Sequence, residues 1–592
     1  MRAIPNQALW PENRAREGEL FFAQVMEEML FDYSTESQRV PTHNSDTRSA
    51  EVLEIIDRIR NSEISAKNFL APAQELVWSI KKDPIAREIL GGRYEWLIQK
   101  LNDIQQNDHF ENSVVYFRRN VQNKYFDTCC ELLFSLINEG RKKSEIYRLT
   151  QSLCTSLINM GYSREGIYYH VRRCFFSSKS NISETTFNEF IKRYDGEIYE
   201  YDAYIKISIT FSTIWEKLKT SNNLSTANLI NDADKIPGIT KDAKKYLNTN
   251  DGLILHLKVP GLDTNSSKSF AESILTYFEA LTHEYQHNAD ISWDKNIFIK
   301  RDGKRWGILV NDSVSDVMKR RDVGYDQTVA GVSKGLRILA DGRLPIESRS
   351  KITSASQAHS NALSAQRPET QLTALWSAVE TILPPRKDGA NITHYIDQIT
   401  PALMIGYSKG TISTLLSDFR NTFADQFLEL IRPKNTGENI LIRFSKILLL
   451  EDFIDDKEKL LDMAAKHPLA VYKIHKTQKE LRNPKSVREY NKLHEKKIKW
   501  QIERIYRARN DIIHAGKVPE SINLLVSNLH EYYDSIMFNF SHYLHLSDTN
   551  ASIENIFTVM RIDFEFYDRC LVDFCKTNRL NEENLPAVLG IF

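Results

Sequence analysis

The sequence predicts a mainly α-helical protein with one small α/β segment. Of its 592 residues, 41% are hydrophobic and 26% are charged, a balance typical of folded globular proteins. Apolar residues recur three and four positions apart over most of the chain, as in amphipathic helices. Alternating apolar and polar residues, which indicate strands, occur in the middle. We expect a helical N-terminal domain of unknown role over residues 1–200, a small α/β domain over 201–345, and an all-α domain with a C-terminal helical extension over 346–592.

Charge and hydropathy exclude several classes of protein. The chain has 78 basic and 78 acidic residues, so no overall field attracts it to nucleic acid or to a membrane. The first twenty residues contain no apolar core of signal-peptide length. The densest apolar cluster, residues 440–454, is interrupted by four charged residues, so we expect no membrane-spanning segment. The six cysteines contain no CxxC and no regular spacing, which favours reduced thiols. We therefore expect a cytoplasmic protein.

The middle segment contains the signals for strands. Apolar and polar residues alternate in DGLILHLKVPGLD, residues 251–263, which predicts a strand. Two β-rich arms flank Asp302 and Gly303 in NIFIKRDGKRWGILV, which predicts a hairpin. A helix is expected between them. Five of its apolar residues should pack against the strands: Phe270, Ile274, Tyr277, Phe278 and Leu281.

One motif in this segment has the pattern of a zinc protease. The sequence HEYQH, residues 283–287, matches HExxH on a predicted helix, with His283 and His287 one turn apart and Glu284 as general base. A catalytic zinc needs a third protein ligand. Downstream there are only isolated acids with no second motif: Asp290, Asp294 and Asp312. We expect no metal here and a polar helix end whose histidines face water, with His283 and His287 as the candidate ligands of the alternative.

The second candidate site closes a basic stretch. Between Lys473 and Arg509 the sequence has thirteen Lys and Arg residues against four Glu, the local positive charge that an RNA backbone requires. The stretch ends in RARNDIIHAGK, residues 507–517. Gly516 suits the end of a helix, where basic side chains are also favoured by the helix dipole. A basic, glycine-terminated helix without catalysis is therefore the alternative interpretation.

Helical geometry separates the polar side chains of this segment. Asn510 and His514, four residues apart, lie on one face, and Arg507 shares a stripe with His514. Arg509 lies about 140° away from His514 around the helix. The two side chains need not meet within one chain, and they could line a groove that a second copy completes.

Two segments resemble a known family. IYRARNDIIHAG, residues 505–516, resembles the signature of HEPN domains, in particular the Apea-like branch, in which a tyrosine precedes an RNxxxH core followed by a small residue and a glycine. LWSAVETIL, residues 375–383, resembles the Trp-containing helix of the same family, with Glu380 at its acidic position. The resemblance covers roughly residues 350–545. The first 200 residues resemble nothing that we can name.

The resemblance implies a helical domain that pairs with a second copy and forms a composite RNase site. It implies metal-independent RNA cleavage through attack of the ribose 2′-hydroxyl, with no cofactor. By resemblance, Arg509 clamps phosphate, His514 is the general acid or base, and Asn510 orients them. Supporting or substrate-binding roles fall to Tyr506, Arg507 and Glu380, and the spacing leaves open whether Arg507 or Arg509 is catalytic.

Large bacterial chains that end in such a domain are often anti-phage or abortive-infection effectors, so the resemblance also implies a toxin-like defence role. The expected partners are RNA, with tRNA among the candidates, a second copy in a homodimer or even-numbered oligomer, and a phage component as trigger. Two alternatives stay open: a non-catalytic RNA-binding or scaffold protein of the same family, and the HExxH zinc metalloprotease.

Overall fold

The computed structural model describes most of the chain in separate stretches. They are residues 14–31, 40–177, 185–222, 227–248, 253–311, 325–340, 344–385, 391–432, 438–546 and 551–591, with residues 10, 182, 183 and 342. Helices predominate and the strands form a small antiparallel sheet, so the mainly α prediction is confirmed.

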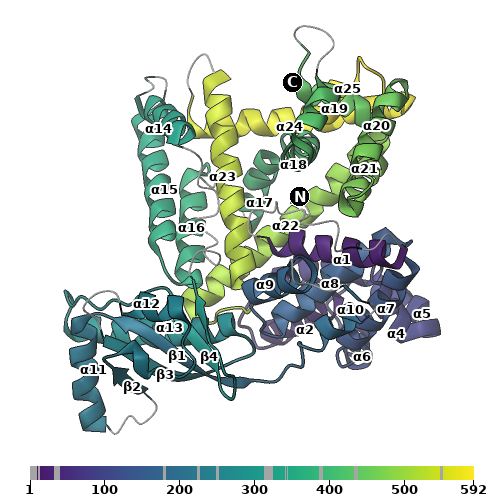
Figure 1. Ribbon diagram of the computed structural model, residues 1–592. Coiled ribbons are helices and arrows are strands. Elements are labelled where there is room, and N and C mark those ends of the chain that lie inside the picture. The colour runs from purple at the N-terminus through teal and green to yellow at the C-terminus, as the bar shows by residue number, and fades with distance from the viewer. Residues whose placement is uncertain are drawn as a thin grey trace. The chain divides into compact units, whose positions relative to one another are not determined.

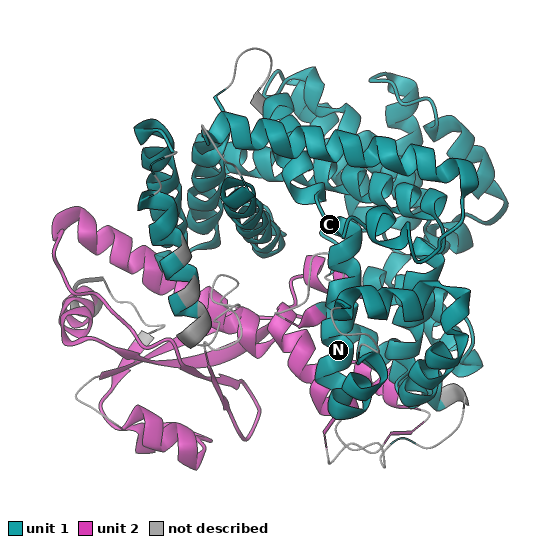
Figure 2. Ribbon diagram, turned by 90° about the horizontal axis from the view of Figure 1, so that it is seen from above, with its two compact units in different colours: residues 1–29, 33–153, 317–592 teal, residues 30–32, 154–316 magenta. Residues whose placement is uncertain are grey.

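The chain divides into two compact units (Figure 2). Unit 1 comprises residues 1–29, 33–153 and 317–592, and unit 2 comprises residues 30–32 and 154–316. Unit 1 therefore joins helices from both ends of the chain. The finer division into domains at residues 200 and 345 stays a prediction.

Unit 2 contains a five-stranded antiparallel sheet with the order β2-β3-β1-β4-β5. Its strands are β1 (Tyr199–Ile207), β2 (Ala227–Ile230), β3 (Leu253–Gly261), β4 (Ile297–Arg301) and β5 (Ile308–Val310). The predicted strand is β3 and the predicted hairpin is β4–β5, so both are confirmed. At the hairpin turn the Lys304 N–H donates to the Arg301 carbonyl at 3.1 Å, and Gly303 has φ 71°, a conformation that glycine adopts without strain.

Helices cover both faces of this sheet. On one face lie α11 (Ile209–Asn222) and α13 (Thr264–Tyr285), and on the other lies α12 (Lys241–Leu247). The expected contact face of α13 is partly wrong. Ala271, Leu275 and Phe278 are buried, whereas Phe270, Tyr277 and Leu281 are 45%, 63% and 38% exposed. The buried stripe is centred one position further round the helix, where the small Ala271 side chain fits directly against the strands.

Two further helices of unit 2, α9 (Arg164–Phe175) and α10 (Thr186–Ile191), precede the sheet. The carboxylate of Asp263, which caps the N-terminus of α13, also accepts hydrogen bonds from the backbone N–H and hydroxyl of Ser163, the N-cap of α9. One buried side chain therefore fixes the start of two helices.

The N-terminal part of unit 1 is helical, as expected. Its helices are α1 (Arg14–Leu30), α2 (Ser45–Arg60), α3 (Leu70–Ile80), α4 (Pro84–Leu90), α5 (Tyr94–Leu101), α6 (Asp108–Val121) and α7 (Tyr125–Glu139), followed by α8 (Lys143–Asn159), which continues into unit 2 after Leu153. Their apolar stripes are buried. A capping box formed by Asn44 and Thr47 begins α2, the helix that contributes to the candidate site described below.

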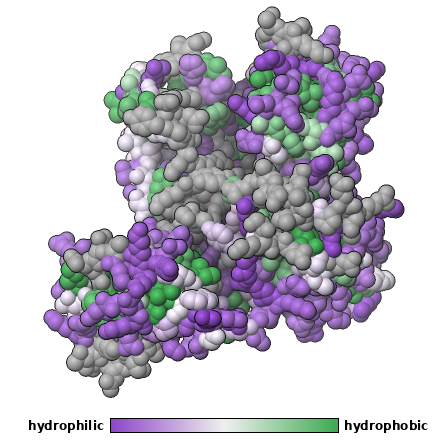
Figure 3. Space-filling view, in the orientation of Figure 1, coloured by the Kyte–Doolittle hydropathy of each residue, from purple (hydrophilic) through white to green (hydrophobic). Residues whose placement is uncertain are grey.

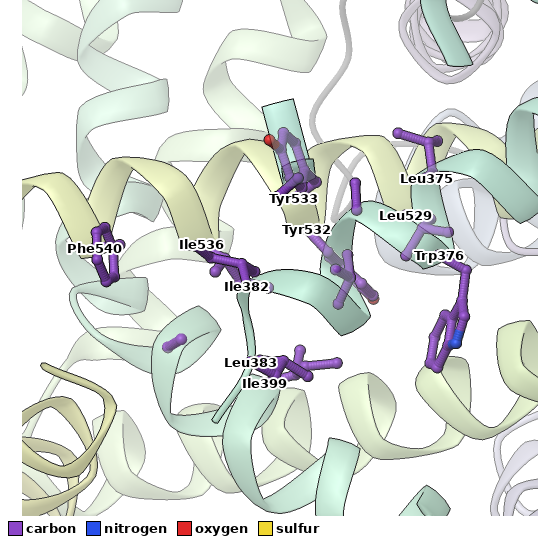
Figure 4. Packing of buried hydrophobic residues seen from close by; sticks show 14 of the residues in the cluster. Leu375, Trp376, Ile382, Leu383, Ile399, Leu529, Tyr532, Tyr533, Ile536 and Phe540 are labelled. Atoms are coloured by element: carbon purple, nitrogen blue, oxygen red, sulfur yellow. The ribbon is translucent and has the colours of Figure 1, made fainter. Parts of the chain in front are cut away.

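The C-terminal part of unit 1 contains two hydrophobic cores. The first is formed by α15 (Ile346–Ser364), α16 (Pro368–Ile382), α17 (Asn391–Met404), α22 (Pro484–Ala515), α23 (Ile522–Leu546) and α24 (Ile553–Thr577), beside α14 (Tyr325–Ala340). Figure 1 shows α15, α16 and α23 side by side. Figure 4 shows the side chains of Trp376, Ile382, Leu529 and Ile536 in this core.

The second core is formed mainly by α18 (Tyr407–Ile431), α19 (Ile440–Leu449), α20 (Ile454–Ala464), α21 (Pro468–Leu481) and α25 (Leu585–Leu589). The long helix α22 contributes to both cores, through Val487 near its start and Ile505 near its end. The rigid helix therefore connects the two cores and extends its final turns toward the candidate site.

Both ends of α22 have the expected signals. At its start, Asn483 accepts a hydrogen bond from the Ser486 N–H at 2.9 Å and Pro484 occupies the first turn. At its end, Gly516 is left-handed with φ 63°, and its N–H donates to the Ile512 carbonyl at 3.2 Å. This termination confirms the prediction from Gly516.

Hydrophilic residues occupy much of the described surface that is visible in Figure 3, with hydrophobic residues in smaller groups between them. Within the described stretches, no helix is both long and apolar enough to cross a membrane.

Candidate active site

The final turns of α22 bring polar side chains to the surface. Tyr506, Arg509 and Asn510 are half-buried, and His514 is exposed in the last turn. The Arg509 guanidinium donates to the amide oxygen of the adjacent Asn510 at 3.0 Å. This hydrogen bond links Arg509 to Asn510. The Arg509 side chain is 24% exposed, so it remains accessible to solvent.

Glu380, from the last turns of α16, lies opposite this arginine. One carboxylate oxygen is 3.9 Å from the Arg509 guanidinium, and the other accepts a hydrogen bond from the Tyr395 hydroxyl at 2.6 Å. Burial, and then the hydrogen bond to Glu380, raise the pKa of Tyr395 well above its ordinary value. The phenol therefore stays protonated and donates to Glu380, which fixes the carboxylate beside Arg509.

Three aromatic rings pack against one another beside the polar cluster. The Trp376 ring packs edge-on against Tyr395 at 5.3 Å and contacts Tyr506 at 5.6 Å, and the two tyrosine rings are 5.8 Å apart. Trp376 is fully buried. The predicted Trp-containing helix, α16, and the predicted basic helix, α22, thus contact each other through these rings. The ring contacts hold Glu380 and Arg509 on one side of the cluster.

Arg507 has entirely different surroundings from Arg509. Its guanidinium donates to Glu51 of α2 at 2.7 Å, and the same carboxylate binds Arg504 at 2.9–3.1 Å. Arg504 also pairs with Glu75 of α3. The structure therefore separates the two arginines, with Arg507 in an internal ion network and Arg509 beside Glu380 and Asn510.

The pKa values in this network agree with paired charges. Burial alone would raise the pKa of Glu51, but the Arg504 guanidinium opposes burial and holds the pKa well below its ordinary value. Burial and Arg504 act on Glu75 in the same opposed way, with a net downward shift of its pKa. Both carboxylates are thus ionised partners of the arginines at neutral pH.

The basic stretch is less available than its composition suggests. Acidic or aromatic side chains of other helices contact many of its cations: Lys473 with Glu28 and Asp418, Arg488 and Lys492 with Asp568, Lys497 with Trp78, and Arg504 and Arg507 with Glu51. Much of the local positive charge is therefore neutralised inside unit 1. The excess of basic over acidic residues in this stretch is therefore larger than its excess of unpaired positive charge.

His514 is exposed in the last turn of α22, four residues beyond Asn510. Within the part of the chain that the structure describes, its imidazole makes no hydrogen bond, ion pair or ring contact. Its neighbour Asp511 is paired with Arg58 of α2 at 2.5–2.9 Å. The structure thus brings together Glu380, Tyr506, Arg509 and Asn510, and leaves His514 exposed to solvent one turn further along.

The HEYQH segment does not have the geometry of a zinc-protease helix. Helix α13 ends at Tyr285, so His287 lies beyond it, and its Nδ1 atom is 2.8 Å from the His283 carbonyl. The Nε2 atom of His283 is 3.0 Å from the Ala289 carbonyl. Gln286, at the end of the helix, has a non-helical backbone conformation. Of the downstream acids, Asp312 lies outside the described residues.

Sequence reasoning missed two parts of the candidate site. Tyr395 had no motif to mark it, because its contact with Glu380 depends on how α16 and α17 pack. Glu51 and Glu75 lie in the N-terminal helices, 453 and 429 positions from Arg504. The one sequence signal for these acidic partners was the excess of basic residues in the α22 segment, because cations on a partly buried helix require acidic partners elsewhere.

No family model, curated protein or solved structure matched the chain in three comparisons with known proteins.

Proposed function

We propose that the chain is a metal-independent endoribonuclease of the HEPN type, with Arg509 and His514 as its catalytic residues. The observation that carries the proposal is the exposed end of α22, where Arg509, Asn510 and His514 occur in the RNxxxH order. The cluster of Glu380, Tyr395 and Tyr506 around Arg509 adds support, because it fixes the guanidinium at the surface.

The chemistry requires no bound metal. The ribose 2′-hydroxyl loses its proton to a base and attacks the adjacent phosphorus, and the bond to the 5′-oxygen breaks as that oxygen gains a proton. A 2′,3′-cyclic phosphate and a 5′-hydroxyl result. The imidazole of His514 can take or give a proton near neutral pH. The planar guanidinium of Arg509 can form two hydrogen bonds to the phosphate and stabilise its developing charge.

A second copy of the chain would complete the site. Arg509 and His514 lie about 140° apart around α22, so one copy does not bring their two side chains together. A two-fold axis would place Arg509 of each copy near His514 of the other. The proposal thus includes a homodimer or an even-numbered assembly.

The cellular role that we propose is anti-phage defence in the cytoplasm, with a phage component as trigger and tRNA among the RNA substrates. In support, the N-terminal helix α2 pairs with Arg504, Arg507 and Asp511 close to the candidate site. A signal that moves α2 would therefore reach the catalytic end of α22 directly.

The experiment is cleavage of tRNA and total RNA by purified protein in the presence of EDTA. We expect cleavage that persists in chelator, yields 2′,3′-cyclic phosphate ends, and disappears in His514→Ala. The matched control is His545→Ala, an exposed histidine near the end of α23, which should cleave normally. Cleavage that needs added metal, or that survives in His514→Ala, would contradict the proposal.

A non-catalytic RNA-binding or scaffold protein is the second candidate. The internal pairing of the α22 cations favours the scaffold form of this candidate, because cations that bind acidic side chains of the same unit are less available to RNA. This candidate predicts that none of the RNA substrates is cleaved and that His514→Ala binds RNA as the wild type does. We do not propose the metalloprotease, because His287 lies beyond the end of α13.

A further inference from the structure

Two histidines and one aspartate meet in unit 1, outside the residues of the proposed ribonuclease site. His359 lies on α15, and His530 and Asp534 lie one turn apart on α23. The two helices belong to the same hydrophobic core and are separated in sequence by the whole of α16 to α22. Figure 1 shows α15 and α23 running beside α16.

The ligand atoms of the three side chains have the spacing of a metal site. The Nε2 atoms of His359 and His530 are 3.0 Å apart, and a carboxylate oxygen of Asp534 is 3.8 Å from the Nε2 atom of His530. All three atoms lie within 4.8 Å of one another. Ligands bonded to a tetrahedral zinc ion at 2.0–2.1 Å lie about 3.3 Å apart. The observed distances lie on both sides of that value.

The surroundings hold the imidazoles in place while leaving access from solvent. The ring of Tyr533 stacks on His359 at 4.7 Å with an interplanar angle of 16°, and Figure 4 shows Tyr533 within the core. His530 is nearly buried, with its side chain 13% exposed, whereas the Asp534 side chain is 36% exposed. An ion could therefore enter from the aspartate side, where water could be the fourth ligand.

The close approach of the two rings also suits neutral imidazoles. Two cationic imidazoles cannot share the 3.0 Å separation of their Nε2 atoms without strong repulsion. Neutral imidazole is the form that coordinates metal ions.

We propose that His359, His530 and Asp534 bind one divalent transition-metal ion, zinc foremost, which links α15 to α23. Two imidazole nitrogens and one carboxylate oxygen form a ligand set that zinc favours, whereas calcium and magnesium prefer oxygen ligands alone. With three protein ligands, the ion stabilises unit 1 by tying together two helices that are distant in sequence. This proposal is independent of the ribonuclease proposal, because the two sites share no residue.

The competing explanation of the short distance is a hydrogen bond between the two imidazoles. In that arrangement one neutral ring donates its Nε2–H to the Nε2 atom of the other, and no ion is required. The hydrogen bond does not involve Asp534. Metal binding that depends on Asp534 as well as on both histidines therefore distinguishes the two explanations.

The test uses the full chain without an affinity tag, stripped of metal by chelator and then titrated with Co²⁺ and Zn²⁺. We expect one equivalent of Co²⁺ to bind per chain with the visible absorption of a tetrahedral complex, and Zn²⁺ to displace it and raise Tm. His359→Gln and His530→Gln should each weaken Zn²⁺ binding at least tenfold, and Asp534→Asn should weaken it severalfold.

Two controls keep the test specific. His545→Gln, on the same helix α23, should bind metal like the wild type, and so should the double variant His283→Gln with His287→Gln. Circular dichroism establishes which variants fold. One folded variant among the three ligand variants is sufficient for the test. Absence of bound Co²⁺ in the wild type would overturn the proposal. So would wild-type affinity in a folded ligand variant, or loss of binding in the HEYQH double variant alone.

Discussion

Two arginines that are two positions apart on α22 have opposite surroundings, and this difference predicts their roles. Arg509 faces Glu380 and Asn510 at the surface, whereas Arg507 is enclosed beside Glu51. We expect Arg509→Ala to reduce the rate of RNA cleavage by about 10²–10³-fold, the effect of removing one group that stabilises transition-state charge.

Arg507→Ala is the matched variant of this pair. It should lower the thermal stability of the chain while the folded fraction cleaves RNA at a rate close to that of the wild type. The measurement is single-turnover cleavage, normalised to folded protein, for both variants. If Arg507→Ala abolishes cleavage and Arg509→Ala does not, the assignment of the catalytic arginine is wrong.

A buried histidine in unit 2 predicts how stability depends on pH. His170 is 6% exposed, its Nδ1 atom is 2.9 Å from the Tyr194 hydroxyl, and burial, followed by Arg193 and Arg173, lowers its pKa to about 3. Because the unfolded imidazole binds a proton near pH 6.5 and the folded one does not, acid favours the unfolded chain. The loss should begin below pH 6.5 and continue to about pH 3, reaching about 2 kcal/mol at pH 5.

His170→Phe tests this prediction, because a phenyl ring can still stack on Phe190 but cannot bind a proton. The measurement is thermal unfolding of both proteins between pH 7.5 and pH 5. Tm of the wild type should fall more steeply with acid than Tm of the variant. Parallel pH profiles would show that His170 is not the group responsible.

At the scale of secondary-structure elements, α2 and α22 are joined by charges rather than by apolar contacts alone. Glu51 is the shared partner of Arg504 and Arg507, and its side chain is 16% exposed. Removing its charge leaves two enclosed guanidinium groups with less compensation. Breaking such a pair from one side costs about 3–5 kcal/mol, so Glu51→Gln should lower Tm by several degrees.

Glu54→Gln is the control on the same helix. Glu54 pairs with Lys517, but both side chains are about half exposed, at 48% and 58%. Exposed pairs contribute about 0–1 kcal/mol, so this variant should unfold close to the wild-type temperature. Equal losses of stability in Glu51→Gln and Glu54→Gln would mean that burial of the network does not matter.

Short sequence patterns predicted the helices and strands whose signals lie within a few neighbouring residues. The strand β3, the β4–β5 hairpin and the end of α22 at Gly516 each follow from residues within a few positions. The central strand β1 was not assigned, although Tyr201, Ala203, Ile205 and Ile207 alternate and are buried. Polar residues at Asp202 and Lys206 complete this alternation. The sequence signal for the strand was therefore present, and only Tyr204, which is buried on the other face of the sheet, interrupts it.

Contacts between distant segments could not be predicted in the same way. The resemblance indicated Glu380 and Arg509, and the structure brings their charged groups within 3.9 Å. Nothing local indicated that Tyr395 would donate to Glu380 or that Glu51 would neutralise α22. These contacts depend on helix packing, and packing is decided by the complementarity of whole faces rather than by a short motif.

At the scale of the whole molecule, the proposed ribonuclease site predicts how many copies of the chain assemble. Among the described residues, Arg509 has hydrogen-bond and ion-pair partners within unit 1, whereas the exposed imidazole of His514 makes no hydrogen bond or ion pair. The proposed ribonuclease site is shared between two copies of the chain. Light scattering of the purified protein should therefore give the mass of a dimer or of a larger even-numbered assembly under the conditions in which RNA is cleaved.

Mixing two impaired variants tests the shared site directly. Alone, Arg509→Ala should cleave RNA about 10²–10³-fold more slowly than the wild type, and His514→Ala should not cleave it. In a mixed dimer, one of the two sites combines the intact His514 of the first variant with the intact Arg509 of the second. If subunits exchange freely, half of the dimers are mixed and half of their sites are intact, so about a quarter of the wild-type activity should return. An unmixed control and a mixture of either variant with Arg509→Ala/His514→Ala should stay inactive. If the Arg509→Ala and His514→Ala mixture also stays inactive although exchange is verified by mass, each copy must instead contain its own complete site, and the two-fold arrangement would be wrong.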